Sequence, residues 1–342
     1  MKAIILPRIS DVEEKPLQLV DLPKPEPGSK EMLVKVSACG VCHTELDEIT
    51  GRTPPPEFPI ILGHEIVGRV EKKGKGAGKF KIGDRVGIGW IHSTCGRCSF
   101  CRDGNENLCE KFLATGRDAN GGYAEYTTVP EDFAYPIPEK FSDLEAAPLL
   151  CAGVVGYRAL RLTNIKDGDT LGLFGFGASA HMIIQVAKYK YPNSKVYVFT
   201  REGQKEHQEL ARGLGADWVG ATGEDPPQKL NCAIDFTPAW NPIVEAMKAM
   251  ERNGRLVINA IRKEDRDKNS LLKLDYARDI WLEKEIKSVA NVSRKDAVDL
   301  LPLAVEISIR PKVQEFKLEE ANEALLLLLQ GKINGAGVLK IG

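Results

Sequence analysis

The sequence predicts an α/β protein in which an irregular β-rich half precedes a half built on a doubly wound parallel sheet. Two features of the residue pattern predict this class. Gly and Pro interrupt the first 150 residues, and only short β-forming runs lie between them. From about residue 151, apolar strand-like runs alternate with helical stretches, which is typical of a parallel sheet covered by helices.

The strand candidates of the β-rich half are short and separated by turn residues. Prolines at 54–56 and the glycine pair at 121–122 mark two of the turns. We therefore expect an irregular all-β domain that carries loops. Its clearest strand candidates span residues 33–36, 66–71 and 85–88.

The second half alternates strands and helices up to about residue 291. Beyond that point, helical segments and a last strand-like run at 337–341 resemble neither half. The predicted strands span 170–174, 195–199, 232–236, 255–259 and 286–289, and the first helices span 182–190 and 204–214.

Composition excludes several kinds of partner and compartment. The 342 residues include 47 Lys and Arg against 48 Asp and Glu, so charge favours neither nucleic acid nor an anionic membrane as a partner. Charges scattered through the first thirty positions exclude the apolar core of a signal peptide. The longest apolar run, 325–329, is too short to span a bilayer. We expect a soluble, cytoplasmic protein.

A glycine-rich turn follows the first strand of the alternating half. Residues 175–180 read GFGASA, a G-x-G-x-x-A pattern between a strand and a helix. Gly175 permits a tight turn, Gly177 lets the backbone approach a pyrophosphate, and Ala180 allows close packing of helix on strand. The amides at the start of the helix would face the phosphates. The pattern predicts a dinucleotide site of the Rossmann type.

The end of the second strand indicates which dinucleotide is bound. An NAD site usually has Asp or Glu there to hold the ribose 2′-hydroxyl, but this strand ends in Thr200 and Arg201. A hydroxyl and a guanidinium suit a 2′-phosphate, which a carboxylate would repel. We therefore predict a preference for NADP. NAD is the alternative, because a two-residue shift would bring Glu202 into place. Asn259, at the end of a later strand, is a further predicted cofactor contact.

Four of the eight cysteines lie in one loop with the spacing C-x2-C-x2-C-x7-C. Such spacing lets one loop supply four thiolates to a closed tetrahedral zinc site. An iron–sulfur cluster is the alternative, but the ferredoxin pattern has a shorter last gap and then proline, whereas Glu110 follows here. We predict zinc at Cys95, Cys98, Cys101 and Cys109.

Three other residues are candidate metal ligands: Cys42, His64 and Cys151. Each alone is weak evidence, because a single Cys or His is more often packed in a protein core than bound to a metal. Their surroundings are more specific. Residues 39–44 read CGVCHT, 63–65 read GHE, 83–86 read GDRV and 121–126 read GGYAEY. With the four-cysteine loop and the glycine-rich turn, in this order, these motifs resemble the zinc-dependent alcohol dehydrogenases of the medium-chain dehydrogenase/reductase family. The resemblance extends over essentially the whole chain.

The resemblance implies a domain organisation and two zinc ions per chain. It implies a GroES-like catalytic domain at 1–152 with both zinc sites, a Rossmann cofactor domain at 153–291, and a return to the catalytic domain at 292–342. The four-cysteine loop would hold a structural zinc. The catalytic zinc would have three ligands and a fourth position open to water or substrate; these ligands are Cys42, His64 and Cys151.

The resemblance also implies reversible oxidation of an alcohol to an aldehyde or ketone, with zinc as the Lewis acid and nicotinamide as the hydride acceptor. Thr44 would take the alcohol proton, His43 would reach the cofactor pyrophosphate, and Glu65 would be a carboxylate beside the zinc. Glu45 replaces the aspartate that orients the zinc histidine in relatives. Asp47 stands where many relatives have the histidine that ends the proton relay.

Trp90 occupies a place where, in relatives, tryptophan narrows the substrate cleft and favours small primary alcohols. A packing tryptophan is the alternative. Within the same fold, a polyol or cinnamyl-type dehydrogenase is a rival function, and a non-catalytic NADPH-binding relative is another. A zinc-finger nucleic-acid binder would not have this near-neutral charge or a Rossmann half. We expect a small-molecule alcohol or aldehyde as substrate and a homo-oligomer, a tetramer or dimer.

Overall fold

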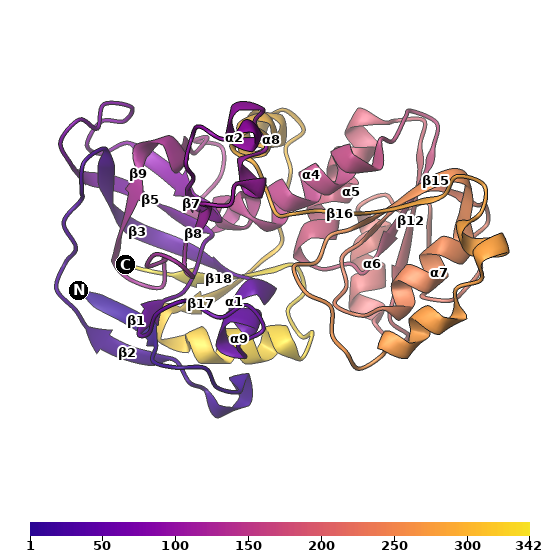
Figure 1. The fold of residues 1–342 in the computed structure, drawn as a ribbon, viewed down its shortest axis with the longest axis horizontal. Helices are drawn as coiled ribbons and strands as arrows, with labels where there is room; N and C mark the ends of the chain where they lie inside the picture. The colour runs from indigo at the N-terminus through magenta and orange to yellow at the C-terminus, as the bar shows by residue number, and fades with distance from the viewer. The chain divides into compact units, whose positions relative to one another are not determined.

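The computed structural model describes residues 1–342 and separates into two compact units (Figure 1). Unit 1 contains Met1–Val154, Val292–Val305 and Arg310–Gly342, and unit 2 contains Val155–Asn291 and Glu306–Ile309. The predicted class is confirmed: an irregular β unit and a parallel-sheet unit make a mixed α/β protein. No helix has the length and apolar character needed to cross a membrane.

The main sheet of unit 1 has the order β10-β6-β5-β3-β18-β17, and β9 also pairs with β3. The long central strand β3 buries the consecutive residues Met32, Leu33 and Val34, so at this point the sheet is covered on both faces. The strands are β3 (Glu31–Val41), β5 (Ile66–Lys73), β6 (Arg85–Ile88), β9 (Tyr126–Pro130), β10 (Ala134–Pro136), β17 (Val313–Lys317) and β18 (Ala336–Lys340).

The end of the chain completes this sheet. β18 runs antiparallel to β3, with Gly337 opposite Val41, and parallel to β17. In Figure 1 the yellow C-terminal strands lie beside the indigo-to-purple strand β3. The segment beyond residue 291, whose sequence matched neither half, therefore joins the sheet through a strand partner far away in the sequence.

Smaller elements surround the main sheet of unit 1. A three-stranded sheet has the order β2-β1-β4, and β7 and β8 form a separate pair. These strands are β1 (Lys2–Leu6), β2 (Gln18–Asp21), β4 (Ile60–Ile61), β7 (Ile91–Ser93) and β8 (Leu113–Ala114). The helices are α1 (His43–Ile49), α2 (Ser99–Arg102), α3 (Asp143–Ala146), α8 (Arg294–Glu306) and α9 (Ala321–Leu329), with short turns η1 (Val12–Glu14), η2 (Glu106–Leu108), η3 (Glu131–Phe133), η4 (Ala147–Leu150) and η7 (Leu318–Glu320).

Unit 2 is a six-stranded parallel sheet with the order β13-β12-β11-β14-β15-β16. β11 is buried along its whole length, and Phe174 at its end stacks on Phe199 of β12 at 4.2 Å. The strands are β11 (Thr170–Phe174), β12 (Lys195–Thr200), β13 (Trp218–Ala221), β14 (Leu230–Asp235), β15 (Met250–Ile258) and β16 (Glu285–Ser288). The helices are α4 (Ala152–Thr163, which begins in unit 1), α5 (Ala178–Lys190), α6 (Lys205–Gly213) and α7 (Asn241–Ala249), with η5 (Lys268–Lys273) and η6 (Tyr276–Ile280).

The strand order of unit 2 places a ligand crevice. β12 and β13 continue from β11 in one direction, whereas β14, β15 and β16 continue in the other. The order therefore reverses between β11 and β14, and ligands of such sheets bind outside the carboxyl ends of the strands at that point. The glycine-rich turn begins at the carboxyl end of β11.

Candidate metal centres and dinucleotide site

Cys42 lies at the junction of β3 and α1. Its backbone is extended, and it is the N-cap of the helix. Its amide donates to Glu45 Oε2 at 2.7 Å, as in a capping box, which ends the strand and starts the helix at this residue. The junction fixes the direction of the Cys42 thiol, whose Sγ lies 3.6 Å from Thr44 Oγ1.

Two other segments of unit 1 bring further donors to the Cys42 thiol. His64 and Glu65 come between β4 and β5, and Cys151 separates η4 from α4. The ligand atoms of these four residues all lie within 4.8 Å of one another, and His64 Nε2 is 3.2 Å from Cys151 Sγ. Two thiols, an imidazole and a carboxylate form a donor set that suits zinc. The residues present therefore fit the ion.

His64 is oriented from its other ring nitrogen. Nδ1 lies 2.7 Å from Glu45 Oε1, and both side chains are fully buried. The longer side chain of Glu45, compared with aspartate, reaches the Cys42 amide with one oxygen and the imidazole with the other. A carboxylate on the outer nitrogen fixes the tautomer and directs Nε2 to the metal site.

The electrostatics of the cluster favour a thiolate at Cys42. The hydrogen bond from Cys151 and those from His64 and Thr44 hold the pKa of Cys42 well below its ordinary value despite burial. Burial lowers the pKa of His64, but the charge of Glu45 and hydrogen bonds to Cys42 and Glu45 raise it well above the ordinary value overall. A metal ion binds the thiolate and the neutral imidazole, so binding releases protons here.

Glu65 is buried against β3. Burial and then the charge of Cys42 raise the pKa of Glu65 well above its ordinary value. Any Cβ at position 40 would overlap the carboxylate of Glu65, while the Gly40 amide donates to Glu65 O at 2.9 Å. Glycine at position 40 therefore makes room for the acid beside the metal ligands.

The other predicted residues of unit 1 lie close to this cluster or are engaged elsewhere. Thr44 is buried beside Cys42, and Trp90 meets His64 edge to face, with ring centroids 4.9 Å apart. His43 is exposed at the start of α1. Asp47 accepts an ion pair from Arg52 at 2.6 Å, so its carboxylate already has a cationic partner.

The four cysteines of the second predicted site also converge. Their sulfur atoms lie within 4.8 Å of one another. Backbone amides point at the sulfurs: Cys98 N donates to Cys95 Sγ at 3.4 Å, and Cys101 N donates to Cys98 Sγ at 3.5 Å. The amides of Arg97 and Cys98 lower the pKa of Cys95 to about 6. The set fits a closed, four-thiolate zinc site.

Glu106 anchors the four-cysteine loop, and its role was not evident from the sequence. It lies between Cys101 and Cys109 and is 2% exposed. Both the backbone N and Nε of Arg294, at the start of α8, donate to Glu106 Oε1, at 2.9 and 2.8 Å. The sequence shows an acidic residue within the metal loop, but its burial and its partner on a distant helix appear only in the structure.

In unit 2, the glycine-rich turn has the conformation that the pattern requires. Gly175 has φ of +84°, and its amide donates to Phe199 O at 2.8 Å. Gly177 is the N-cap of α5, and a Cβ there would meet nothing within 4 Å, so the helix start is open to a ligand. Ala180 is fully buried, where the helix packs on the sheet.

The residues predicted to select the cofactor differ in their exposure and in their hydrogen bonds within the protein. Thr200 is fully buried; its hydroxyl donates to Arg201 O at 3.1 Å and accepts from Gln208 Nε2 at 2.9 Å. Arg201 is exposed. Gln208, one turn into α6, is a site neighbour that the sequence analysis missed. Asn259 is half-buried, and its amide donates to Asp235 O at 2.8 Å.

Comparison with known proteins agrees with this geometry. Residues 28–139 match the family model of the alcohol dehydrogenase GroES-like domain. A probable alcohol dehydrogenase AdhA of Mycobacterium tuberculosis (strain CDC 1551 / Oshkosh) is 40% identical over 346 residues, covering 100% of this chain and 97% of the relative. An alcohol dehydrogenase of Geobacillus stearothermophilus is 35% identical over 337 residues, covering 96% of each chain. A solved NAD-dependent alcohol dehydrogenase superposes with a TM-score of 0.89 at 26% identity, over 100% of both chains.

Proposed function

Because this chain belongs to the medium-chain, zinc-type alcohol dehydrogenase family, we propose that it is a zinc-dependent dehydrogenase that interconverts an alcohol with an aldehyde or ketone. One observation carries the proposal: the convergence of Cys42, His64 and Cys151 donors, with Glu65 beside them, in a buried site. A non-catalytic protein would not need three ligands at distant positions to be held in this geometry.

The chain's own residues have distinct roles in this reaction. Cys42, His64 and Cys151 would hold the zinc, and Glu45 keeps the imidazole directed at it. When bound, zinc supplies a Lewis acid, and the nicotinamide dinucleotide supplies the hydride acceptor. The Thr44 hydroxyl, which is buried beside the Cys42 sulfur, would accept the proton of the alcohol oxygen while it passes its own proton on through a relay that includes the cofactor ribose.

The proposed dinucleotide is NADP. What supports it is the absence of a carboxylate at the end of β12, where Thr200 is followed by the exposed guanidinium of Arg201. A guanidinium pairs with a 2′-phosphate far better than with a hydroxyl. A solved relative is described as NAD-dependent, so NAD is the competing cofactor. Equal catalytic efficiency with NADH and NADPH, or a preference for NADH, would contradict this choice.

The proposed substrate is a small primary alcohol or the matching aldehyde. Trp90 is 3% exposed and packs on the imidazole of His64, while Phe112 lies 6.3 Å from its ring. A large aromatic ring against a zinc ligand leaves little room for a bulky substituent at the reacting carbon. Polyols and cinnamyl alcohols are the rival substrates.

A rate panel tests the proposal as a whole. Primary, secondary, polyol and cinnamyl alcohols and their carbonyl products would be assayed with NADP and NAD, together with measurement of the metal content. We expect turnover of small primary alcohols, two zinc ions per chain and no iron. Turnover that survives removal of all zinc by a chelator would contradict the proposed mechanism.

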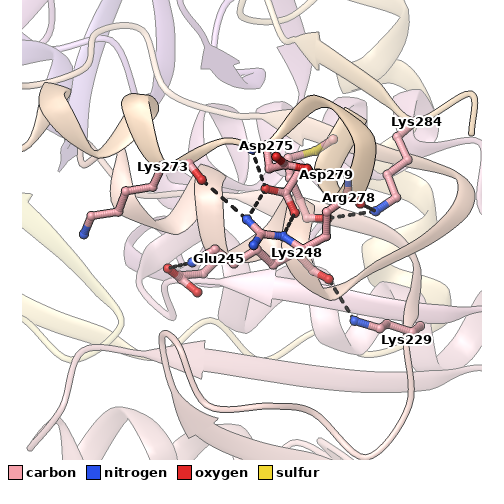
Figure 2. A network of polar contacts seen from close by, with 9 residues as sticks. Lys229, Glu245, Lys248, Lys273, Asp275, Arg278, Asp279 and Lys284 are labelled. Atoms are coloured by element: carbon pink, nitrogen blue, oxygen red, sulfur yellow. Dashed lines mark hydrogen bonds and ion pairs between the residues drawn. The ribbon is translucent and has the colours of Figure 1, made fainter. Parts of the chain in front are cut away.

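We also propose a homo-oligomer that pairs through β16. All four residues of this edge strand are exposed, Ile286 among them, and Tyr276 and Trp281 in the preceding segment also expose apolar surface. Polar contacts hold the preceding segment (Figure 2): Arg278 makes two bonds of 2.6 Å to the buried Asp279, and Lys284 donates to Arg278 O at 3.0 Å. An exposed edge of this kind favours pairing with a second copy.

The proposed location is the cytoplasm. All eight cysteines are free thiols, and the two clusters need reduced thiolates to bind metal. Reducing compartments keep thiols in this state.

A further inference from the structure

Two loops meet at the carboxyl edge of the unit 2 sheet. Loop 236–240 follows β14, and loop 259–267 follows β15. The first loop lies against the glycine-rich turn: Phe236 N donates to Phe174 O at 2.9 Å, and a Cβ on Gly175 would be 2.9 Å from Thr237 Cγ2. Loop 236–240 is therefore one wall of the crevice at which the strand order reverses.

A buried ion pair holds this wall. Lys263 reaches across from loop 259–267 and pairs with the carboxylate of Asp235, the last residue of β14. Its Nζ also donates to Thr237 O at 2.7 Å and to Ala239 O at 2.9 Å, so all three ammonium donors have acceptors. The side chains of Lys263 and Asp235 are 8% and 0% exposed.

The other carboxylate oxygen of Asp235 also accepts hydrogen bonds. Oδ1 accepts from Thr237 N at 2.9 Å and from Thr237 Oγ1 at 2.7 Å. Burial raises the pKa of Asp235, although the charge and hydrogen bond of Lys263 oppose that rise. The ionised pair is thus bound into loop 236–240 at both ends.

Two further ties connect the same loops. The Glu264 amide donates to Pro238 O at 2.8 Å. The Asp267 carboxylate accepts from Trp240 N at 3.0 Å and from Asn241 N at 2.7 Å, at the start of α7. A carboxylate is favourable at a helix N-terminus. Loop 259–267 therefore fixes loop 236–240 from Thr237 to the helix that follows it.

Stability alone does not account for a buried ion pair. Taking both charges out of water is unfavourable, and apolar residues of similar volume often give equal or better stability. A charged pair does, however, select one loop conformation, because any other would leave a buried charge unpaired. That selectivity matters most where a loop must meet a ligand with fixed geometry.

We propose that Lys263 and Asp235 are positioning residues of the dinucleotide site. They set loop 236–240 against the glycine-rich turn before the ligand arrives, so that binding does not have to order this wall. The inference rests on the proposed use of a nicotinamide dinucleotide. It adds two residues that belong to no dinucleotide-binding motif of the sequence.

Direct binding tests the inference without turnover. The dissociation constant of NADPH would be measured by its fluorescence for the wild type, Lys263→Met and the control Lys188→Met, whose partner Asp217 lies in an exposed pair on the same unit. We expect roughly tenfold weaker binding for Lys263→Met, equivalent to about 1.4 kcal/mol. The control should stay within about twofold, and zinc content should not change in either variant.

A second comparison separates positioning from stability. In Asp235→Asn/Lys263→Met no unpaired charge is buried, so the unfolding temperature should recover toward wild type, whereas NADPH affinity should stay low because Thr237 O and Ala239 O still lack their donor. Affinity that recovers together with stability would overturn the positioning role. Thr237→Val, which loses the hydroxyl bonds to Asp235 Oδ1 and Ala239 O, should fold and bind about threefold more weakly.

The outcomes for the inference and for the proposed function are distinct. If the wild type binds neither NADPH nor NADH, the proposed function fails, and the inference fails with it. If the wild type binds and all the variants bind equally well, the inference alone fails.

Discussion

His64 is held at both ring nitrogens, one facing Cys151 Sγ at 3.2 Å and the other Glu45 Oε1 at 2.7 Å. Glu45 also accepts from the Cys42 amide, so one carboxylate positions two of the proposed ligands. At the scale of single residues, the metal site therefore depends on a group that does not itself belong to the ligand set.

Replacing Glu45 should weaken zinc binding without removing a ligand. Glu45→Gln keeps the size of the side chain but loses the charge that holds the imidazole. The dissociation constant of zinc should rise by about 10- to 100-fold, measured by chelator competition. Asp47→Asn, on the same helix but paired with Arg52, is the control and should leave zinc affinity unchanged. Equal affinity in both variants would exclude the orienting role.

The buried thiol of Cys232 should lower the free energy of unfolding at alkaline pH. Burial raises the pKa of Cys232 to about 12, whereas an exposed thiol titrates near pH 8.5. Between these values the unfolded chain binds fewer protons than the folded one, so stability falls as pH rises. The contribution is about 1.4 kcal/mol per pH unit. Denaturant unfolding of wild type and Cys232→Ala at pH 8, 9 and 10 should show a steeper decline for the wild type; parallel declines would contradict this.

At the scale of elements, β3 and the residues that precede β5 approach so closely that position 40 must be glycine. Gly40→Ala should force Glu65 away from the metal ligands, because its Cβ would overlap the carboxylate. We expect a loss of about 1–3 kcal/mol in the free energy of unfolding, as for other overpacked sites. Gly213→Ala, where a Cβ would meet nothing within 4 Å, is the matched control and should be neutral or slightly stabilising. Equal stability of the two variants would refute the argument.

The local sequence pattern predicted the bounds of some strands better than those of others. The strands predicted at 170–174 and 85–88 coincide with β11 and β6, because apolar runs with clear turn signals define both ends. β15 begins at Met250, not at 255, since the polar residues after Met250 gave no strand signal; Met250 pairs with Leu230, and the register shifts before Arg255 pairs with Cys232. β13 (Trp218–Ala221) was missed because it is short and half-buried.

The residues of the candidate site also differ in whether the sequence alone could identify them. Gly175 could be named from sequence because the spacing of its motif carries the chemistry, and Cys42 and His64 because the motifs around them resemble those of a known family. Glu106, Gln208 and Lys263 could not, because each acts through a partner that only the folded chain brings within reach. Such partners have no fixed spacing to detect.

At the scale of the whole molecule, self-association is the clearest prediction. In an antiparallel pair of β16 strands centred on Ile286, Glu285 of one chain would face Lys287 of the partner subunit. Ile286→Lys should place like charges in that interface and lower the oligomeric state, measured by light scattering after gel filtration. Val298→Lys replaces another exposed apolar residue, on α8, and should leave the assembly intact. An unchanged mass for Ile286→Lys would exclude pairing through β16.

The pairing of β18 with β3 also has a consequence for biosynthesis. Strand β3 (Glu31–Val41) leaves the ribosome long before its neighbour β18 (Ala336–Lys340) has been made. Nearly all of unit 2, from Val155 to Asn291, is synthesised between them as one continuous stretch. Unit 2 can therefore fold before the sheet of unit 1 is complete, because that sheet has to wait for β18.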